Sequence, residues 1–300
     1  MKEEYSVMEI PAVDDLFDKD IRNIFCIRKS GGRAVYKAIY DGHQVILKNV
    51  KDSKRAETEF NNQKKAYNLL KSRGLKVPKP INLKGSWIVS EFIEGKKKQL
   101  GYEELQKSLR YLHILHSSDY SAIYPLNCHY YGQNLINRLK QEEDFLLNAI
   151  QKHPKISSFK NDFSGISKIA INYAFCDSPV AGHGDFQPNN IIVDKSEIIP
   201  IDWIDFGILL RWYDVGNLLF QQNGDELLSL VKYYLQLDSK QSNSSAEKVE
   251  EDVRKSLSIA FIIRTGSSFR HLVETNEDSS EHFRRIETNI NYINEIFKSL

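Results

Sequence analysis

The stretch from Ala181 to Gly207 limits what this 300-residue chain can fold into more than any other part of the sequence. It reads AGHGDFQPNNIIVDKSEIIPIDWIDFG and interrupts segments whose apolar residues recur three and four positions apart, a spacing typical of helices. Its polar loop HGDFQPNN is followed by an apolar strand (191–193), a polar turn and a second apolar strand (198–201) that leads to Asp202. The pattern predicts a strand hairpin with acidic and amide side chains beside it.

Three side chains of this segment carry the oxygen atoms that phosphoryl transfer to a hydroxyl requires. One carboxylate must position the hydroxyl and accept its proton, and further oxygen ligands must hold Mg²⁺ beside a triphosphate. Asp185, Asn190 and Asp202 meet these needs. Each alone is more typical of an exposed turn, since Asp and Asn favour turns. Their order within the predicted strand context favours the catalytic interpretation.

The loop HGDFQPNN resembles the His-Gly-Asp-x-x-x-x-Asn catalytic loop of aminoglycoside phosphotransferases, choline kinases and related kinases, and PIDW resembles their Ile-Asp magnesium motif. The resemblance implies that Asp185 is the catalytic base, that Asn190 and Asp202 bind magnesium and that His183 orients the loop. It also implies an α+β, two-lobed, protein kinase-like fold. A small N-terminal lobe would hold an antiparallel sheet and one helix, and a larger C-terminal lobe would be mainly helical.

Asp205-Phe206-Gly207 has the spelling of the protein-kinase metal motif and offers an alternative metal ligand. Asp202 is preferred because it emerges directly from the second hairpin strand, whereas Asp205 lies three residues further and is expected to assist from outside the ligand set. Downstream, WYDVG resembles the family's Asp-Leu-Ala segment, whose acid braces the catalytic loop. This assigns a structural role to Asp214.

The N-terminal third has the pattern of the small lobe. Three strands (24–29, 35–40 and 44–50) precede a helix over 56–73, and a further strand covers 86–93. The pair Asp41-Gly42 between the second and third strands predicts a tight hairpin turn, which requires backbone conformations with positive φ. The lobes are therefore expected to be 1–93, which binds nucleotide, and 94–300, which carries the catalytic and acceptor-binding residues.

Candidates for phosphate binding lie in this lobe. Ser30, Gly31 and Gly32 join the first two strands, where small residues let backbone amides approach phosphate oxygens, although such a pair of glycines is also an ordinary hairpin turn. Lys48 resembles the family lysine that contacts the α- and β-phosphates; an exposed edge-strand lysine is the alternative, and Lys51 is a less well placed rival.

The helix is expected to supply a glutamate for Lys48. At the position where the family commonly has this glutamate, the chain has Gln63 instead. Glu59, one helical turn earlier, faces a similar direction and is preferred, with Glu57 as a weaker candidate. Position and resemblance assign adenine to the segment Glu91, Phe92 and Ile93, whose backbone would bind the base. ATP is the expected nucleotide, and GTP is an alternative.

Composition narrows the remaining classes of function. The 41 basic and 40 acidic side chains give no overall electrostatic reason to bind nucleic acid or a membrane surface. Three separated cysteines (Cys26, Cys128 and Cys176) suit reduced thiols, and no apolar run reaches the ~18 residues of a membrane span. A cytoplasmic monomer or homodimer is expected.

The sequence therefore predicts a kinase that transfers the γ-phosphoryl group of ATP or GTP to a hydroxyl of a small molecule, such as an aminoglycoside, a sugar or an amino alcohol. A Ser/Thr protein kinase-like enzyme is an alternative, disfavoured because HGD replaces His-Arg-Asp and no Ala-Pro-Glu segment follows. A non-catalytic nucleotide-binding regulator is less favoured still. The acceptor stays open; the donor-rich segment 264–271 is either part of its site or an exposed helix end.

Overall fold

A computed structural model describes most of the chain, and its contacts divide the chain into two compact units. The first unit is Met1–Lys98 with Asn190–Phe206, and the second is Gln99–Asn189 with Gly207–Leu300. The described residues are 21–30, 33–50, 52–95, 99–121, 127–175, 178–238, 245–274 and 280–300. Gly31, Gly32, Lys51 and Cys176 lie outside them.

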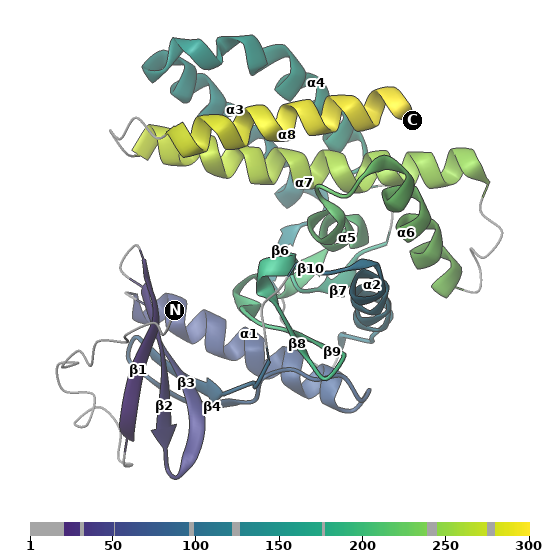
Figure 1. Cartoon of the computed structure of the whole chain (residues 1–300). Helices are drawn as coiled ribbons and strands as arrows, with labels where there is room; N and C mark the ends of the chain where they lie inside the picture. The colour runs from purple at the N-terminus through teal and green to yellow at the C-terminus, as the bar shows by residue number, and fades with distance from the viewer. Residues whose placement is uncertain are drawn as a thin grey trace. The chain divides into compact units, whose positions relative to one another are not determined.

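The first unit contains a five-stranded sheet in the order β1-β2-β3-β5-β4 (Figure 1). All neighbouring strands are antiparallel. The β2–β3 turn is the predicted one, since Asp41 and Gly42 both have positive φ, at 52° and 79°. Its strands are β1 (Ile21–Ser30), β2 (Arg33–Tyr40), β3 (His43–Val50), β4 (Pro80–Lys84) and β5 (Trp87–Glu91).

Helix α1 (Ser53–Lys71) covers one face of this sheet. Asp52 caps its start, where the side chain accepts a hydrogen bond from the Lys54 backbone at 2.9 Å. Ala56 of α1 packs with Val50 and Ile88 of the sheet, so this face forms one core cluster. The opposite face buries a separate cluster that includes Leu47 and Val89. Because side chains alternate along a strand, Lys48 lies on the face that α1 covers.

A hairpin from the later part of the chain completes the first unit. Strands β8 (Ile191–Asp194) and β9 (Glu197–Pro200) pair antiparallel, and the short 3-10 helix η4 (Trp203–Asp205) follows and contacts α1. The chain at Gly95 passes so close to β8 that a Cβ atom there would lie 2.5 Å from the Ile192 side chain and 2.8 Å from the Val193 carbonyl oxygen. The predicted hairpin is therefore confirmed.

The second unit is mainly helical and contains one small sheet. Strand β10 lies between β6, to which it is parallel, and β7, to which it is antiparallel. The strands and 3-10 helices are β6 (Asn127–Tyr130), β7 (Val180–Gly182), β10 (Gly207–Leu209), η2 (Pro154–Phe159) and η3 (Pro188–Asn190). The helices are α2 (Tyr102–His116), α3 (Gly132–Lys152), α4 (Lys160–Asn172), α5 (Arg211–Leu219), α6 (Gly224–Leu237), α7 (Ala246–Glu274) and α8 (Ser280–Ser299).

Helix α7 is the centre of the second unit. It contacts α3, α4, α5, α6 and α8, and α8 runs alongside it (Figure 1). At the crossing with α5 the backbones touch, because a Cβ atom on Gly216 would lie 2.0 Å from the Ser256 carbonyl oxygen. The donor-rich segment 264–271 lies in the last turns of α7, which ends at Glu274, and only Ser267 of the segment is exposed, so its interpretation as an exposed segment is wrong.

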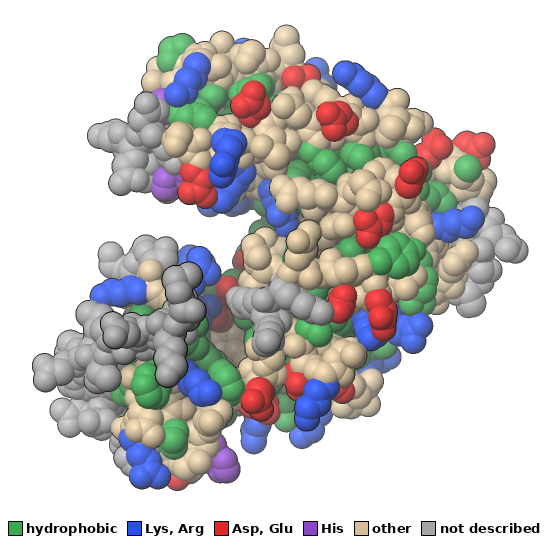
Figure 2. Space-filling model, viewed as in Figure 1, with side chains coloured by type: hydrophobic (Ala, Val, Ile, Leu, Met, Phe, Trp, Pro, Cys, Tyr) green, Lys and Arg blue, Asp and Glu red, His purple; other side chains and the backbone are tan. Residues whose placement is uncertain are grey.

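The predicted α+β class is confirmed by the five-stranded antiparallel sheet and the mainly helical second unit. None of the described helices is long and apolar enough to cross a membrane. On the face shown in Figure 2, basic and acidic side chains are interspersed, as the near-neutral composition indicates.

The α5–α7 crossing gives a stability prediction. Gly216→Ala forces the two helices apart and is expected to lower the free energy of unfolding by roughly 1–3 kcal/mol. Gly165 of α4 is the matched control, because nothing lies within 4 Å of its added Cβ. Gly165→Ala should raise stability by up to about 1 kcal/mol, since alanine has the higher helix propensity. Urea unfolding followed by circular dichroism measures both, and equal stabilities would contradict the crossing.

Candidate active site

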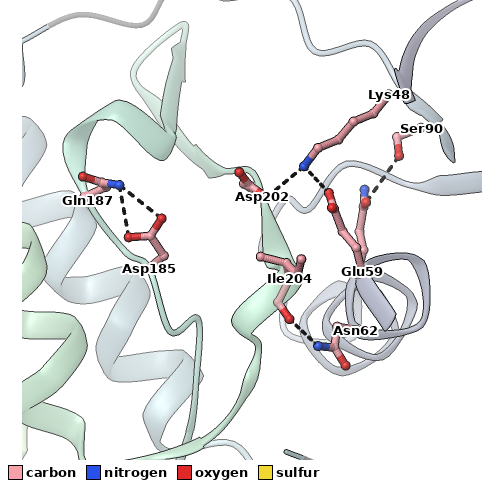
Figure 3. A network of polar contacts seen from close by, with 9 residues as sticks. Lys48, Glu59, Asn62, Ser90, Asp185, Gln187, Asp202 and Ile204 are labelled. Carbon is pink, nitrogen blue, oxygen red and sulfur yellow. Dashed lines mark hydrogen bonds and ion pairs between the residues drawn. The ribbon is translucent and has the colours of Figure 1, made fainter. Parts of the chain in front are cut away.

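In the first unit, the ammonium group of Lys48 lies between two carboxylates from different elements (Figure 3). It donates a hydrogen bond to Glu59 Oε1 of α1, and another to Asp202 Oδ1, which follows β9, at 3.0 Å. The Glu59 side chain is 5% exposed and that of Asp202 is 36% exposed. One carboxylate is therefore buried against the lysine, while the other keeps an open side.

The charges in this cluster shift each other's pKa. Burial lowers the pKa of Lys48, but the negative charges of Asp202 and Glu59 outweigh it, and the net direction is upward. Burial raises the pKa of Glu59, and the charge of Lys48 opposes this rise. Lys48 is therefore a fixed cation near neutral pH, and its positive charge is what keeps a carboxylate at this buried position.

The structure places Glu59 against Lys48 and gives Gln63 a different task. Gln63 donates to the Pro78 carbonyl oxygen at 2.8 Å and accepts from the Ser90 hydroxyl at 3.3 Å, which joins α1 to the strand side of the unit. Glu57, the weaker candidate, is exposed. Asn62, which sequence reasoning missed, donates to the Ile204 carbonyl oxygen at 2.6 Å and fixes η4 against α1 (Figure 3).

The β8–β9 hairpin brings the backbones of the two predicted magnesium ligands together. The Ile201 amide donates to the Asn190 carbonyl oxygen at 2.8 Å, so Asn190 and Asp202 flank the base of the hairpin. Asp202 has φ 67° and ψ 63°, a left-handed conformation that is uncommon for a residue other than glycine. The chain turns sharply there and directs Asp202 to Lys48, while Asp205 comes later, within η4.

The donor set suits magnesium bound together with a triphosphate. Asn190 and Asp202 offer an amide and a carboxylate oxygen, and both side chains are half-buried. Mg²⁺ in nucleotide sites is held by one or two such protein ligands, with phosphate oxygens and water as the others. The described residues contain no group of three His, Cys, Asp or Glu side chains that could hold a metal ion.

In the second unit, Asp214 braces the loop that contains the His-Gly-Asp motif. Its buried carboxylate accepts hydrogen bonds from the backbone amides of His183 and Gly184, at 2.7 and 3.0 Å. Gly184 has φ 84°, a conformation that favours glycine. The structural role predicted for Asp214 is confirmed by these two hydrogen bonds.

A chain of buried polar groups stabilises Asp214 in turn. His116 of α2 lies with Nε2 3.5 Å from the Asp214 carboxylate and with Nδ1 2.7 Å from the Tyr234 hydroxyl of α6. Burial lowers the pKa of His116, and the Asp214 carboxylate only partly opposes this. His116 is therefore neutral at pH 7. Histidine at an apolar helix face is too common a pattern for sequence alone to have indicated this role.

The predicted base, Asp185, is half-buried at the end of the braced loop. Its backbone amide donates to His183 Nδ1 at 3.2 Å, so His183 holds the turn, as its loop-orienting assignment requires. Gln187 Nε2 lies 3.1 Å from each carboxylate oxygen of Asp185 and thereby fixes the orientation of the carboxylate (Figure 3). Sequence reasoning missed Gln187, because it stands at a variable position of the motif.

The other nucleotide candidates are only partly described. Ser30 pairs with Arg33 at the ends of β1 and β2, but Gly31 and Gly32 lie outside the described residues. In the segment after β5, the backbone amide of Glu91 donates to Lys79 and that of Phe92 donates to Gln44.

Comparison with known proteins bears on the fold. No model of a known protein family matches the chain, and no curated protein matches its sequence. Solved structures do match. Choline kinase from Cryptosporidium parvum Iowa II aligns with a TM-score of 0.64 and 16% identity, covering 97% of this chain and 94% of that one.

Two antibiotic phosphotransferase complexes also match. The GDP and kanamycin complex of APH(2″)-IIIa aligns with a TM-score of 0.64 and 13% identity, covering 92% and 96% of the two chains. The streptomycin–ATP–APH(2″)-IIa ternary complex aligns with a TM-score of 0.60 and 14% identity, covering 95% and 97%. The chain shares the fold of these phosphotransferases. The fold expected from the HGDFQPNN motif is therefore confirmed.

The buried histidine gives a pH prediction. The lowered pKa of His116 means that the folded protein binds fewer protons than the unfolded chain, so stability is present above the unfolded pKa and is lost as the pH falls below about 6.5. The loss from this group is at most about 1.4 kcal/mol per pH unit. The groups facing His116 are Asp214 and Arg211 of α5, His113 of its own helix and Tyr234.

His116→Gln should therefore flatten the fall in stability between pH 7.5 and pH 5.5, as measured by urea unfolding at several pH values. His43→Gln is the control, because His43 is exposed in the first unit. An unchanged slope in His116→Gln would contradict the neutral, buried state of the imidazole.

Proposed function

We propose that this protein is a kinase that transfers the γ-phosphoryl group of a purine nucleoside triphosphate to a hydroxyl group of a small molecule. The observation that carries the proposal is the Lys48 ammonium shared by Glu59 and Asp202. It couples a half-buried cation, suited to phosphate oxygens, to the carboxylate predicted to bind magnesium. A purely structural ion pair would not require the left-handed backbone of Asp202.

On the nucleotide side, Lys48 is assigned to the α- and β-phosphates, with Glu59 holding its ammonium in place. The segment from Ser30 to Arg33 is assigned as the phosphate cover. The base is assigned to the backbone at Glu91, Phe92 and Ile93. ATP in one structure of this fold and GDP in another support a purine nucleotide and leave both ATP and GTP as candidates.

Asn190 and Asp202 are assigned as the protein ligands of Mg²⁺. The ion supplies positive charge that neutralises the transferring phosphoryl group and the leaving diphosphate. Lys48 adds a further positive charge next to these ligands, because its ammonium group lies within hydrogen-bonding distance of Asp202. These residues act by position and charge, which is the main protein contribution to phosphoryl transfer.

Asp185 is assigned as the base that accepts the proton of the acceptor hydroxyl. Gln187 orients its two oxygens, and His183 and Asp214 fix the backbone that carries it. The choline kinase and the streptomycin and kanamycin complexes support a small-molecule hydroxyl as the acceptor over a protein side chain.

The base assignment is tested with Asp185→Asn. Mg·ATP or Mg·GTP is incubated with a library of small hydroxyl compounds, and nucleoside diphosphate formation is measured. The variant is expected to lose at least about a hundredfold in kcat, because proton acceptance is removed, while ATP affinity by calorimetry stays within about twofold. Asp144→Asn, at an exposed position of α3, is the control. Retained turnover in Asp185→Asn would sink the assignment.

The metal assignment is tested by comparing Asp202→Asn with Asp205→Asn. Loss of the Asp202 carboxylate removes a magnesium ligand and one partner of Lys48, so ATP affinity in the presence of Mg²⁺ should fall by about tenfold or more. Asp205→Asn should change that affinity by less than about threefold. Calorimetric titrations of ATP with and without Mg²⁺ measure both. A larger loss in Asp205→Asn would transfer the role to the Asp205-Phe206-Gly207 motif.

A further inference from the structure

Arg264 of α7 is a half-buried cation held by neutral oxygens. Its Nε donates to the side-chain oxygen of Asn217 at 3.2 Å, and its Nη2 donates to the Asn217 backbone carbonyl at 2.8 Å. The guanidinium also lies over the Phe220 ring, 5.3 Å from the centroid. Among the described residues, no carboxylate forms an ion pair with this group, although the negative charge of Asp185 acts on it from beyond ion-pair distance.

Helix α5 connects Arg264 to the braced catalytic loop of the same unit. Asp214 of α5 holds the His183 and Gly184 amides, and Asn217, three residues later on that helix, holds Arg264. The α5–α7 contact at Gly216 makes this spacing rigid. The charge of Asp185 also reaches Arg264. Burial lowers the pKa of Arg264, and the negative charge of Asp185 opposes this shift.

Among the residues that the structure describes, hydrogen-bond acceptors contact only one edge of the guanidinium, and the other edge is the one that we assign to a ligand. Nε and Nη2 form one edge of the planar group, and Asn217 occupies it. The edge formed by Nη1 and Nη2 has the geometry that binds two oxygens of a carboxylate or phosphate side by side. Arg285 of α8 adds positive charge near Arg264. A cationic acceptor would meet repulsion here, and an anionic one would neutralise a half-buried charge.

We propose that the acceptor carries an oxyanion, a carboxylate or a phosphate group, which binds to Arg264 while a hydroxyl of the same molecule meets Asp185. This inference rests on the proposed kinase function and specifies its substrate class. Arg264 is then a specificity-determining residue. It distinguishes the chain from relatives whose acceptors, such as choline, streptomycin and kanamycin, are cations at neutral pH.

The experiment uses small polyhydroxy acceptors that carry a negative, a neutral or a positive group. One set is D-gluconate, D-glucose and D-glucosamine, and a second is D-glycerate, glycerol 3-phosphate, glycerol and 3-amino-1,2-propanediol. Nucleoside diphosphate formation gives kcat/KM for each compound, and ligand-observed NMR in the presence of Mg·ADP gives binding. Within the second set, D-glycerate and glycerol 3-phosphate distinguish a carboxylate from a phosphate.

Arg264→Met keeps much of the packing over Phe220 and removes the charge. It is expected to lower kcat/KM for the best anionic acceptor by about 10- to 100-fold and to change that of neutral acceptors by less than about threefold. Arg264→Lys keeps the positive charge but loses the planar edge that binds two oxygens. Its kcat/KM for the best anionic acceptor should lie between those of the wild type and Arg264→Met. Neither variant should alter ATP affinity.

Arg254→Met is the matched control. Arg254 lies on the same helix, is also half-buried, lies over the Phe297 ring at 5.2 Å and donates to the Phe297 backbone carbonyl at 3.4 Å. Like Arg264, it combines a hydrogen bond to a backbone carbonyl with a contact to an aromatic ring, but it has no link to α5. Equal losses in Arg254→Met and Arg264→Met, or an equal loss for neutral and anionic acceptors, would show that Arg264 only joins the helices and would overturn the proposal.

The remaining outcomes distinguish failure of the anionic-acceptor proposal from failure of the kinase proposal. Preferential phosphorylation of D-glucosamine or 3-amino-1,2-propanediol would overturn the anionic class and leave the kinase function standing. Absence of binding by every anionic compound would overturn it too, whether or not ATP binds. Failure of the wild-type chain to bind Mg·ATP would instead count against the kinase proposal itself.

Discussion

The ion pairs of the Lys48 ammonium group hold the first unit together, because they join three elements that are far apart in the sequence. Strand β3, helix α1 and the turn after β9 each contribute one charged group to it. Two carboxylates around one cation leave the cluster with a net negative charge. Burial of Glu59 and exposure of Asp202 mean that the surplus charge is presented where an additional cation can reach it.

In the second unit, a buried carboxylate, that of Asp214, is stabilised by hydrogen-bond donors instead of a charged lysine. The Asp214 carboxylate is surrounded by donors that are neutral at pH 7, two loop amides and the His116 imidazole. Hydrogen bonds to backbone amides fix a main-chain conformation, whereas an ion pair would fix only a side chain. The loop that carries Asp185 therefore has its shape set by α5, and residues 185–190 continue this loop into the hairpin that ends at Asp202.

Sequence reasoning worked where chemistry and local geometry coincide. The Asp41-Gly42 turn, the β8–β9 hairpin and the position of Asp202 just after the second hairpin strand follow from turn residues and strand patterns, which are local properties. It failed for the sheet of β6, β7 and β10, whose strands of three or four residues are too short to show a period. Gln187 and Asn62 were missed because an amide gains its role only from the tertiary neighbour that it meets.

The contact between Arg264 and Asn217 shows why the sequence alone does not predict the class of acceptor. The two residues are 47 positions apart, and nothing in either segment indicates that an arginine on one helix is held by an asparagine on another. Their pairing depends on the close α5–α7 crossing at Gly216. Helix α5 both braces the loop of Asp185 and orients Arg264, so the positions of the proposed base and of the proposed acceptor-binding charge are set by one helix.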